Sequence, residues 1–238
     1  MSRKLIQCDQ VEGSFSINDS NWGLALAEGT AAFLTSAGAA RHGVAGLEAG
    51  VCALHGRLAR FREFHDALEV VRAAQPSAVE PWIWHPLFET EAIRVGLLVV
   101  YRFGRIPLHD HPGAFGAQLV LSGRLRIKQF EQQASSGSSG GLKVLELSID
   151  RELWEGETAS YKPDAGNIHE LEATQPSAVL FTATTPPYCD KERAWYYPVP
   201  LCPQERSRFL VNRVTRRTSV ARLWVETLAG RKAVSVLE

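Results

Sequence analysis

Three histidines carry the clearest chemical signal in this sequence. His109 and His111 lie two positions apart in the segment Gly104-Arg-Ile-Pro-Leu-His-Asp-His-Pro-Gly. In an extended chain, residues two apart project from the same face of a strand. His169 ends a second segment, Pro163-Asp-Ala-Gly-Asn-Ile-His. Because imidazole is the commonest protein ligand for transition metals, we predict a metal site at these three side chains.

The two segments together resemble the metal-binding motifs of the cupin superfamily, which are small double-stranded β-helix barrels that hold a metal inside. In common metal cupins three or four residues separate the second histidine from a glutamate. Those positions here are Phe115 and Gly116, so the expected carboxylate is missing. Three neutral imidazoles leave a ferrous ion with its full charge of about +2, which attracts an anionic soft donor such as a thiolate. The pattern therefore predicts oxidation of a thiol to a sulfinate.

The elements that must position these histidines are short strands. Ile93–Phe103 is a β-branched, apolar run typical of a buried strand. Gln118–Leu121 and Arg124–Phe130, joined by Ser122-Gly123, are predicted to form a hairpin. Further strands are predicted near 142–149, 158–162, 167–173, 178–185 and 194–200, and possible ones at Phe209–Val211 and Val220–Leu228. Many short strands at this spacing indicate a closed β-barrel or a sandwich.

The preceding region is Ala-rich and helical in character. A stripe of apolar residues at helical spacing predicts one helix from about 57 to 74: Leu58, Phe61, Phe64, Leu68 and Val71. The aromatic, proline-containing segment Glu80–Pro86 is predicted to be a covering loop. Ser135–Gly141 is a low-complexity run of serine and glycine, predicted to be a flexible loop.

Composition sets limits on the function. Among 238 residues, 26 basic and 26 acidic side chains give a formal net charge of zero, which provides no basis for nucleic-acid binding. No apolar run approaches the roughly 20 residues that span a bilayer, and the first residues lack the apolar core of a secretion signal. The four cysteines are widely spaced and predict no structural disulfide. We expect a cytoplasmic protein without a membrane or nucleic-acid partner.

A more specific resemblance covers about residues 90–200. The phrases Ile106-Pro-Leu-His-Asp-His-Pro-Gly, Leu121-Ser-Gly-Arg-Leu, Gly166-Asn-Ile-His-Glu and Thr185-Pro-Pro-Tyr are similar to those of the cysteamine dioxygenase and plant cysteine oxidase family. The resemblance implies a mainly β cupin jelly-roll barrel with N-terminal α-helices, mononuclear non-haem Fe(2+) and O2 as co-substrate. The implied substrate is a small aminothiol or a peptide with an N-terminal cysteine, and the family is commonly monomeric. The metal ligands carried over are His109, His111 and His169.

Residues near this predicted metal are weaker candidates. Family members carry an aspartate where this chain has Thr182, and animal members carry a cysteine at the position of Ala194, so the resemblance implies no cysteine–tyrosine crosslink. We assign Tyr196 as a candidate catalytic residue, although barrel packing is the alternative. Candidate substrate-binding residues are Thr182, Tyr188 and Tyr197. By strand alternation, Asp110 and Glu170 should face away from the metal.

These predictions give a three-part chain and three functional hypotheses. Residues 1–78 form a helical extension on the barrel, 79–205 form the cupin barrel, and 206–238 form a C-terminal extension. The leading hypothesis is an Fe(II)-dependent thiol dioxygenase. A non-catalytic or sensory metal-binding cupin is the first alternative, and a metal cupin enzyme acting on non-thiol substrates is the second, although such enzymes more often keep the missing glutamate.

Overall fold

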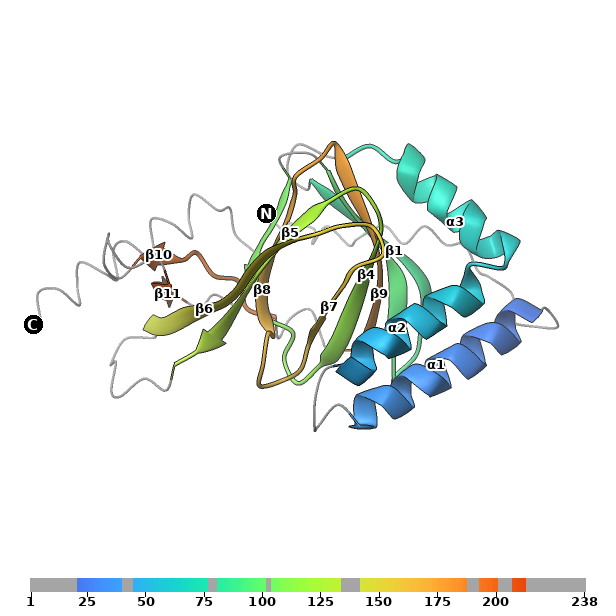
Figure 1. Cartoon of the computed structure of the whole chain (residues 1–238), viewed down its shortest axis with the longest axis horizontal. Helices are drawn as coiled ribbons and strands as arrows, with labels where there is room; N and C mark the ends of the chain where they lie inside the picture. The colour runs from blue at the N-terminus through green and yellow to red at the C-terminus, as the bar shows by residue number, and fades with distance from the viewer. Residues whose placement is uncertain are drawn as a thin grey trace, which may run out of the picture.

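Three helices precede a pair of curved β-sheets in the computed structural model of the chain (Figure 1). The structure describes residues 21–39, 45–76, 81–101, 104–133, 142–187, 193–200 and 207–212. The helices are α1 (Asn21–Ala39), α2 (Ala45–Leu58) and α3 (Arg62–Ala73). The predicted class, a mainly β cupin barrel with N-terminal helices, is confirmed. None of the described helices has the length and apolar character needed to cross a bilayer.

The two sheets of the double-stranded β-helix are antiparallel at every described pairing. One sheet has the order β1-β2-β9-β4-β7 and the other the order β10-β11-β6-β5-β8-β3. The strand bounds are β1 Trp82–Glu89, β2 Arg94–Tyr101, β3 Arg105–His109, β4 Phe115–Ser122, β5 Leu125–Gln132, β6 Leu142–Leu153, β7 Thr158–Tyr161, β8 Ile168–Ala173, β9 Ser177–Thr185, β10 Val199–Pro200 and β11 Arg208–Asn212.

Strand β2 shows why the first sheet is so apolar. Its inner residues Leu98 and Val100 pack in the barrel interior, whereas Val95, Leu97 and Val99 pack in a second cluster with the helices. Both faces of the strand are therefore covered, and a strand covered on both faces reads as a continuous apolar run. The helices occupy the outer face of this sheet, on the right of Figure 1.

The predicted single helix from about 57 to 74 is wrong in its first turn. Helix α2 ends at Leu58 and α3 begins at Arg62, with Phe61 in an extended conformation at φ −106° and ψ 144°. Leu58 at the end of α2 and Phe64 and Val71 of α3 are nevertheless buried in one cluster. The apolar stripe was a correct sign of burial, but it did not reveal the break.

Two strand predictions are also corrected. Segment Trp82–Glu89, predicted as a loop up to Pro86, is strand β1 and pairs with β2. Strands β4 and β5 do not form a hairpin, because β4 pairs with β7 and β9 whereas β5 pairs with β6 and β8. The turn at Gly123, with φ +79°, instead carries the chain from one sheet to the other. A tight turn in the sequence cannot show which sheet receives the next strand.

Other predicted segments are confirmed in part. Strands near 142–149, 158–162, 167–173 and 178–185 correspond to β6, β7, β8 and β9, and the strand at Phe209–Val211 corresponds to β11. The strand predicted at 194–200 is reduced to β10 and an isolated bridge at Trp195. The Ser135–Gly141 loop and the segment Val220–Leu228 lie outside the described residues. The three-part division of the chain stays a prediction.

Candidate metal centre

The structure brings His109, His111 and His169 together at one end of the barrel interior, and all three side chains are buried. Nε2 of His111 lies 3.1 Å from Nε2 of His109 and 3.2 Å from Nε2 of His169. Three nitrogens bound at adjacent octahedral positions, with bonds of about 2.1 Å, would be separated by about 3 Å. Both distances are those of neighbouring ligands on one metal ion, and all three donor atoms lie within 4.8 Å of one another.

Backbone pairing sets this convergence. His109 ends β3 and lies directly opposite His169 of β8 across an antiparallel pair. Asn167, two residues before His169, bonds both backbone groups of His111: its Oδ1 accepts from the His111 N–H at 2.6 Å, and its Nδ2 donates to the His111 carbonyl at 3.0 Å. The two sequence motifs are thus joined by hydrogen bonds, and the asparagine of the second motif orients a histidine of the first.

The outer ring nitrogens of His109 and His111 have partners that help to hold these two imidazoles with Nε2 facing the other histidines. With Nε2 facing inward, Nδ1 carries the proton, and His109 Nδ1 donates to the Pro107 carbonyl at 2.7 Å. His111 Nδ1 lies 3.4 Å from the phenol oxygen of Tyr161, which in turn lies 2.8 Å from the Thr184 hydroxyl. Such outer partners fix the tautomer and the ring orientation of metal-binding histidines.

Burial keeps these imidazoles uncharged. It is the largest cause that lowers the pKa of His169 to about 3, and the positive charge of Arg193 lowers it further. Burial, Arg193 and the neighbouring imidazoles place the pKa values of His109 and His111 well below the ordinary range. Neutral imidazoles present free lone pairs near pH 7, so protons do not compete with a metal there.

One row of residues across the first sheet supplies the wall opposite His111. Arg94 of β2 pairs with Thr184 of β9, Thr184 pairs with Gly116 of β4, and Gly116 pairs with Tyr161 of β7. A side chain at position 116 would overlap the phenol ring of Tyr161, which stacks on His111 at 4.5 Å between ring centroids. At one of the two positions where a carboxylate was expected, the space for a side chain is therefore filled by the ring of a tyrosine from another strand.

The phenol of Tyr161 is itself uncharged. Burial raises its pKa to about 12, although its hydrogen bond with Thr184 acts in the opposite direction. The three histidines and Tyr161 consequently contribute no negative charge, and a bound divalent ion would keep its full charge. Three neutral nitrogen donors fit a divalent transition-metal ion.

A cavity of about 190 Å³ opens beside the three histidines. Its apolar wall includes Leu98, Ile106 and Leu171, and its polar wall includes Gln118, Thr182 and Thr184. Two guanidinium groups, those of Arg94 and Arg193, also line it. The cavity therefore borders the three nitrogens that would hold a metal ion.

With this geometry in view, the chain was compared with known proteins. The model of the PCO_ADO family matches residues 57–236, which include all three histidines and every described strand. This chain belongs to the PCO_ADO family.

Two curated relatives of the PCO_ADO chain are enzymes by name. Plant cysteine oxidase 1 of Arabidopsis thaliana is 29% identical over 109 residues, covering 44% of this chain and 37% of the relative. The 2-aminoethanethiol dioxygenase of Homo sapiens is 26% identical over 157 residues, covering 56% of this chain and 58% of the relative. The chain thus spans less than two thirds of the length of either curated relative.

The chain was also matched with solved structures. A double-stranded β-helix protein from Klebsiella pneumoniae is 24% identical, with a TM-score of 0.36 over 50% of this chain and 86% of that one. A protein from Thermus thermophilus is 17% identical, with a TM-score of 0.38 over 50% of this chain and 95% of that one.

Of the candidate residues predicted near the metal site, some line the histidine cavity and others do not. Thr182 lines the histidine cavity, as the family resemblance suggested. Tyr196 does not line it: its hydroxyl donates to Oδ2 of Asp110 at 2.9 Å, on the other side of the His109–Pro112 segment. Tyr197 packs, partly buried, against the apolar cluster of the barrel, and Tyr188 lies outside the described residues.

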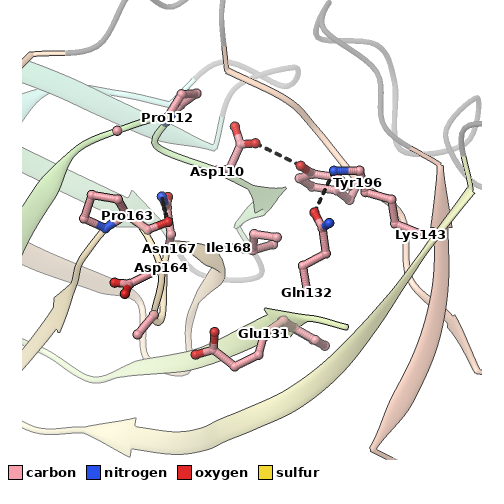
Figure 2. A pocket seen from close by; sticks show the side chains of 13 residues that line it. Asp110, Pro112, Glu131, Gln132, Lys143, Pro163, Asp164, Asn167, Ile168 and Tyr196 are labelled. Atoms are coloured by element: carbon pink, nitrogen blue, oxygen red, sulfur yellow. Dashed lines mark hydrogen bonds between the residues drawn. The ribbon is translucent and has the colours of Figure 1, made fainter. Parts of the chain in front are cut away.

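Figure 2 shows the hollow into which Asp110 and Tyr196 point. It has a volume of about 420 Å³ and is lined by polar side chains that include Glu131 and Asp164, but by none of the three histidines. Asp110 also accepts a hydrogen bond from the Ala194 N–H at 2.7 Å. The prediction that Asp110 is a structural hydrogen-bond acceptor facing away from the metal is therefore confirmed.

Sequence reasoning missed several groups that line the cavity. Arg105, which flanks the first histidine motif, is exposed and pairs with Glu170 and Glu172 on the outer face. The arginines at the cavity are Arg94 and Arg193. Neither lies in a motif, and only the register of β2 with β9 could have placed Arg94.

Proposed function

We propose that this protein is a non-haem iron thiol dioxygenase that adds both atoms of O2 to a thiolate sulfur and forms a sulfinate. The observation that carries the proposal is the convergence of three neutral imidazoles, without a carboxylate, on a small cavity in a PCO_ADO chain. The names of the two relatives favour a small aminothiol or an N-terminal cysteine as the substrate.

The ion would be held by His109, His111 and His169. A ferrous ion bound there would supply the acidity that converts a thiol into a thiolate and the electrons that activate dioxygen. The missing carboxylate favours this chemistry, because three neutral ligands leave the ion more attractive to an anionic sulfur. We expect no dedicated protein base for the thiol proton.

The protein's own groups prepare the cavity for an anion and limit its contact with water. Arg193 lowers the pKa of all three histidines through its positive charge, so the same charge also favours a thiolate at that place. Leu98, Ile106 and Leu171 form a dry wall, and electrostatic interactions strengthen where water is excluded. The cavity thus suits an anionic sulfur next to apolar carbon atoms.

Oxygen uptake by iron-loaded protein tests the proposal. Cysteamine and a peptide with an N-terminal cysteine should each be tried, and products analysed by mass spectrometry should gain two oxygen atoms, both labelled when ¹⁸O2 is supplied. His169→Ala should abolish uptake, whereas His65→Ala, which removes an exposed histidine on α3, should not.

The alternative is a metal-binding cupin without catalysis. It is supported by the uncharged Thr182 in the cavity, at a position where family members carry an aspartate. Tight iron binding without thiol-dependent oxygen consumption would favour that alternative. Iron binding that survives His169→Ala would contradict both functions, because both place the ion on the same three histidines.

A further inference from the structure

Gln118 of β4 is a buried amide that faces the histidine cavity. The side chain is only 6% exposed and lines the cavity, and its Oε1 atom is itself buried. Within the described part of the chain, no donor group reaches this oxygen. A buried acceptor without a donor is unfavourable and uncommon in native proteins. A donor for Oε1 should therefore come from a molecule that enters the cavity.

Strand register places Gln118 beside the row of residues that contacts His111. Gly116, two residues earlier on β4, shares the facing of Gln118 and pairs with Tyr161, which stacks on His111. Successive rows on one face of a strand are about 7 Å apart. Gln118 therefore faces the same interior one row farther along, within reach of a small molecule that also touches the histidines.

Thr182 and Trp84 belong to the row of Gln118. Thr182 of β9 is the direct partner of Gln118, and Gly96 of β2 is the direct partner of Thr182. A side chain at Gly96 would overlap the ring of Trp84, so this ring lies over the row at that place. Thr182 is buried, Trp84 is partly exposed, and both line the cavity. The row thus offers an amide oxygen, a hydroxyl oxygen and an aromatic ring.

This set of groups suits an amino group. The amide oxygen of Gln118 accepts hydrogen bonds, and the hydroxyl oxygen of Thr182 can accept one as well. An aromatic ring such as that of Trp84 attracts a cation. An amino group donates hydrogen bonds in both its neutral and its protonated form, whereas a carboxylate brings only acceptors and could not bond the Gln118 oxygen.

The same cavity has a different character at the histidines. The positive charge of Arg193 acts on all three of them, which favours an anion such as a thiolate at that place. The Gln118 row contributes neutral acceptors instead. The two places would be occupied together by a molecule in which two carbon atoms separate a thiol from an amino group.

We infer that Gln118 is a substrate-binding residue whose Oε1 accepts a hydrogen bond from the amino group of an aminothiol, with Thr182 and Trp84 beside that group. This inference deepens the proposed thiol dioxygenase function and rests on it. The amino group belongs either to free cysteamine or to the N-terminal cysteine of a peptide, because both have the same spacing of sulfur and nitrogen. Gln118 positions the substrate and takes up no proton or electron.

The test compares two thiols of equal length on the iron-loaded protein: cysteamine and 1-propanethiol, in which a methyl group replaces the amino group. Binding is measured without oxygen by calorimetry, and oxygen uptake is measured separately. We expect cysteamine to bind about 10-fold or more tightly than 1-propanethiol. A Cys-initiated peptide amide is titrated in parallel. Dependence on Gln118 for cysteamine, for the peptide or for both supports the inference and identifies the source of the amino group.

Substitutions of Gln118 separate its acceptor from the rest of the side chain. Gln118→Leu should weaken cysteamine binding by about 10-fold and leave 1-propanethiol binding unchanged or stronger. Gln118→Glu keeps an acceptor and loses the amide donor, so it should bind cysteamine at least as tightly as the unaltered protein. Gln133→Leu is the matched control, because the exposed Gln133 side chain bonds Glu146 and should alter neither affinity.

Melting curves of the thiol-free protein give a second readout. Gln118→Leu should leave Tm unchanged or raise it, because an apolar group of similar size replaces an amide oxygen that no described group bonds. Gln129→Leu should lower Tm, since the Nε2 of this buried glutamine donates to the carbonyls of Ser160 at 2.8 Å and Gly166 at 3.2 Å. An equal loss of Tm in both variants would overturn the inference, because Gln118 would then have a partner within the protein.

The binding outcomes separate this inference from the function on which it rests. Unchanged affinity for cysteamine and the peptide in Gln118→Leu would overturn it, since Oε1 would then bond only water. Equal losses for cysteamine and 1-propanethiol would overturn it too, and so would a Gln118→Glu variant as weak as Gln118→Leu. In each of these cases oxygen uptake still tests the dioxygenase. If no thiol supports uptake, the proposed function fails, and the anaerobic affinities still decide whether Gln118 binds the amino group.

Discussion

The phenol ring of Tyr161 occupies the space into which a side chain at Gly116 would project. The two residues are direct partners across β4 and β7, and a Cβ built on Gly116 overlaps the ring. The ring stacks on His111 and its oxygen faces Nδ1 of the same histidine. The absence of a side chain at position 116 and the position of Tyr161 therefore depend on each other, because only glycine at position 116 leaves room for the ring.

Gly116→Ala should therefore destabilise the protein and disturb the metal site. Because the buried ring of Tyr161 cannot move away easily, we expect the free energy of unfolding to fall by about 1 to 3 kcal/mol. Each kcal/mol should lower Tm by about 2 to 4 °C. Melting curves and iron titration measure both effects. Gly56→Ala is the control: it lies on α2 with no atom within 4 Å of the new Cβ, and should be neutral or stabilising. Unchanged metal affinity in Gly116→Ala would contradict the role given to Tyr161.

Tyr161→Phe tests the phenol oxygen alone. The ring would keep its stacking on His111, but Nδ1 of His111 and the Thr184 hydroxyl would lose their common partner. We expect iron affinity to fall by about 10-fold, because outer partners of metal-binding histidines have effects of that order. Tyr101→Phe removes a comparable hydrogen bond, 2.7 Å to the Ala74 carbonyl and far from the histidines. It should lower stability without altering iron affinity, and equal effects on affinity would refute the prediction.

The histidine site could be predicted from sequence because its signal is local. The alternation of an extended chain places His109 and His111 on one face, and the Gly-Asn-Ile-His turn marks His169 as the start of another strand. The rest of the cavity comes from register across strands far apart in the chain. Arg94, Thr184 and Tyr161 share one row only because β2, β9, β4 and β7 pair in that order.

The same reason explains the wrong hairpin. Ser122-Gly123 carries every local sign of a tight turn, and Gly123 does have a positive φ. Which sheet receives β5 depends on the closure of the whole barrel. Local sequence thus gave the position of the turn, while long-range pairing determined its partners. Helix α3 followed the same pattern, because burial of Phe64 and Val71 was predictable and the break before Arg62 was not.

Acid should destabilise the metal-free protein through its buried histidines. In the unfolded chain a histidine binds a proton near pH 6.5, whereas in the fold the pKa of His169 is about 3 and those of His109 and His111 are also low. Between these pH values the unfolded chain binds more protons, so the free energy of unfolding falls as pH falls. Each of the three contributes up to about 1.4 kcal/mol per pH unit below pH 6.

Urea unfolding of chelator-treated protein between pH 7 and pH 5 measures this dependence. His55 and His85 also have pKa values lowered by burial, so the comparison needs a variant that removes one group. His169→Gln should reduce the slope of the free energy of unfolding against pH by the contribution of one bound proton, up to about 1.4 kcal/mol per pH unit. A slope that His169→Gln leaves unchanged would mean that His169 is already protonated in the fold. Bound iron should raise the free energy of unfolding without flattening this dependence, because the metal keeps the folded histidines free of protons while the unfolded chain still binds them.

The last prediction separates Tyr196 from the chemistry. Its hydroxyl donates to Asp110, in a hollow that contains none of the three histidines. Tyr196→Phe should therefore lower the free energy of unfolding by about 1 kcal/mol and leave kcat within about 2-fold. Asp110→Ala should be worse, because it also removes the acceptor for the Ala194 N–H and frees the segment that carries Arg193. We expect its KM for the thiol substrate to rise more than its kcat falls. If Tyr196→Phe instead lowered kcat by 100-fold with normal stability, Tyr196 would have to reach the reacting atoms in a rearranged state.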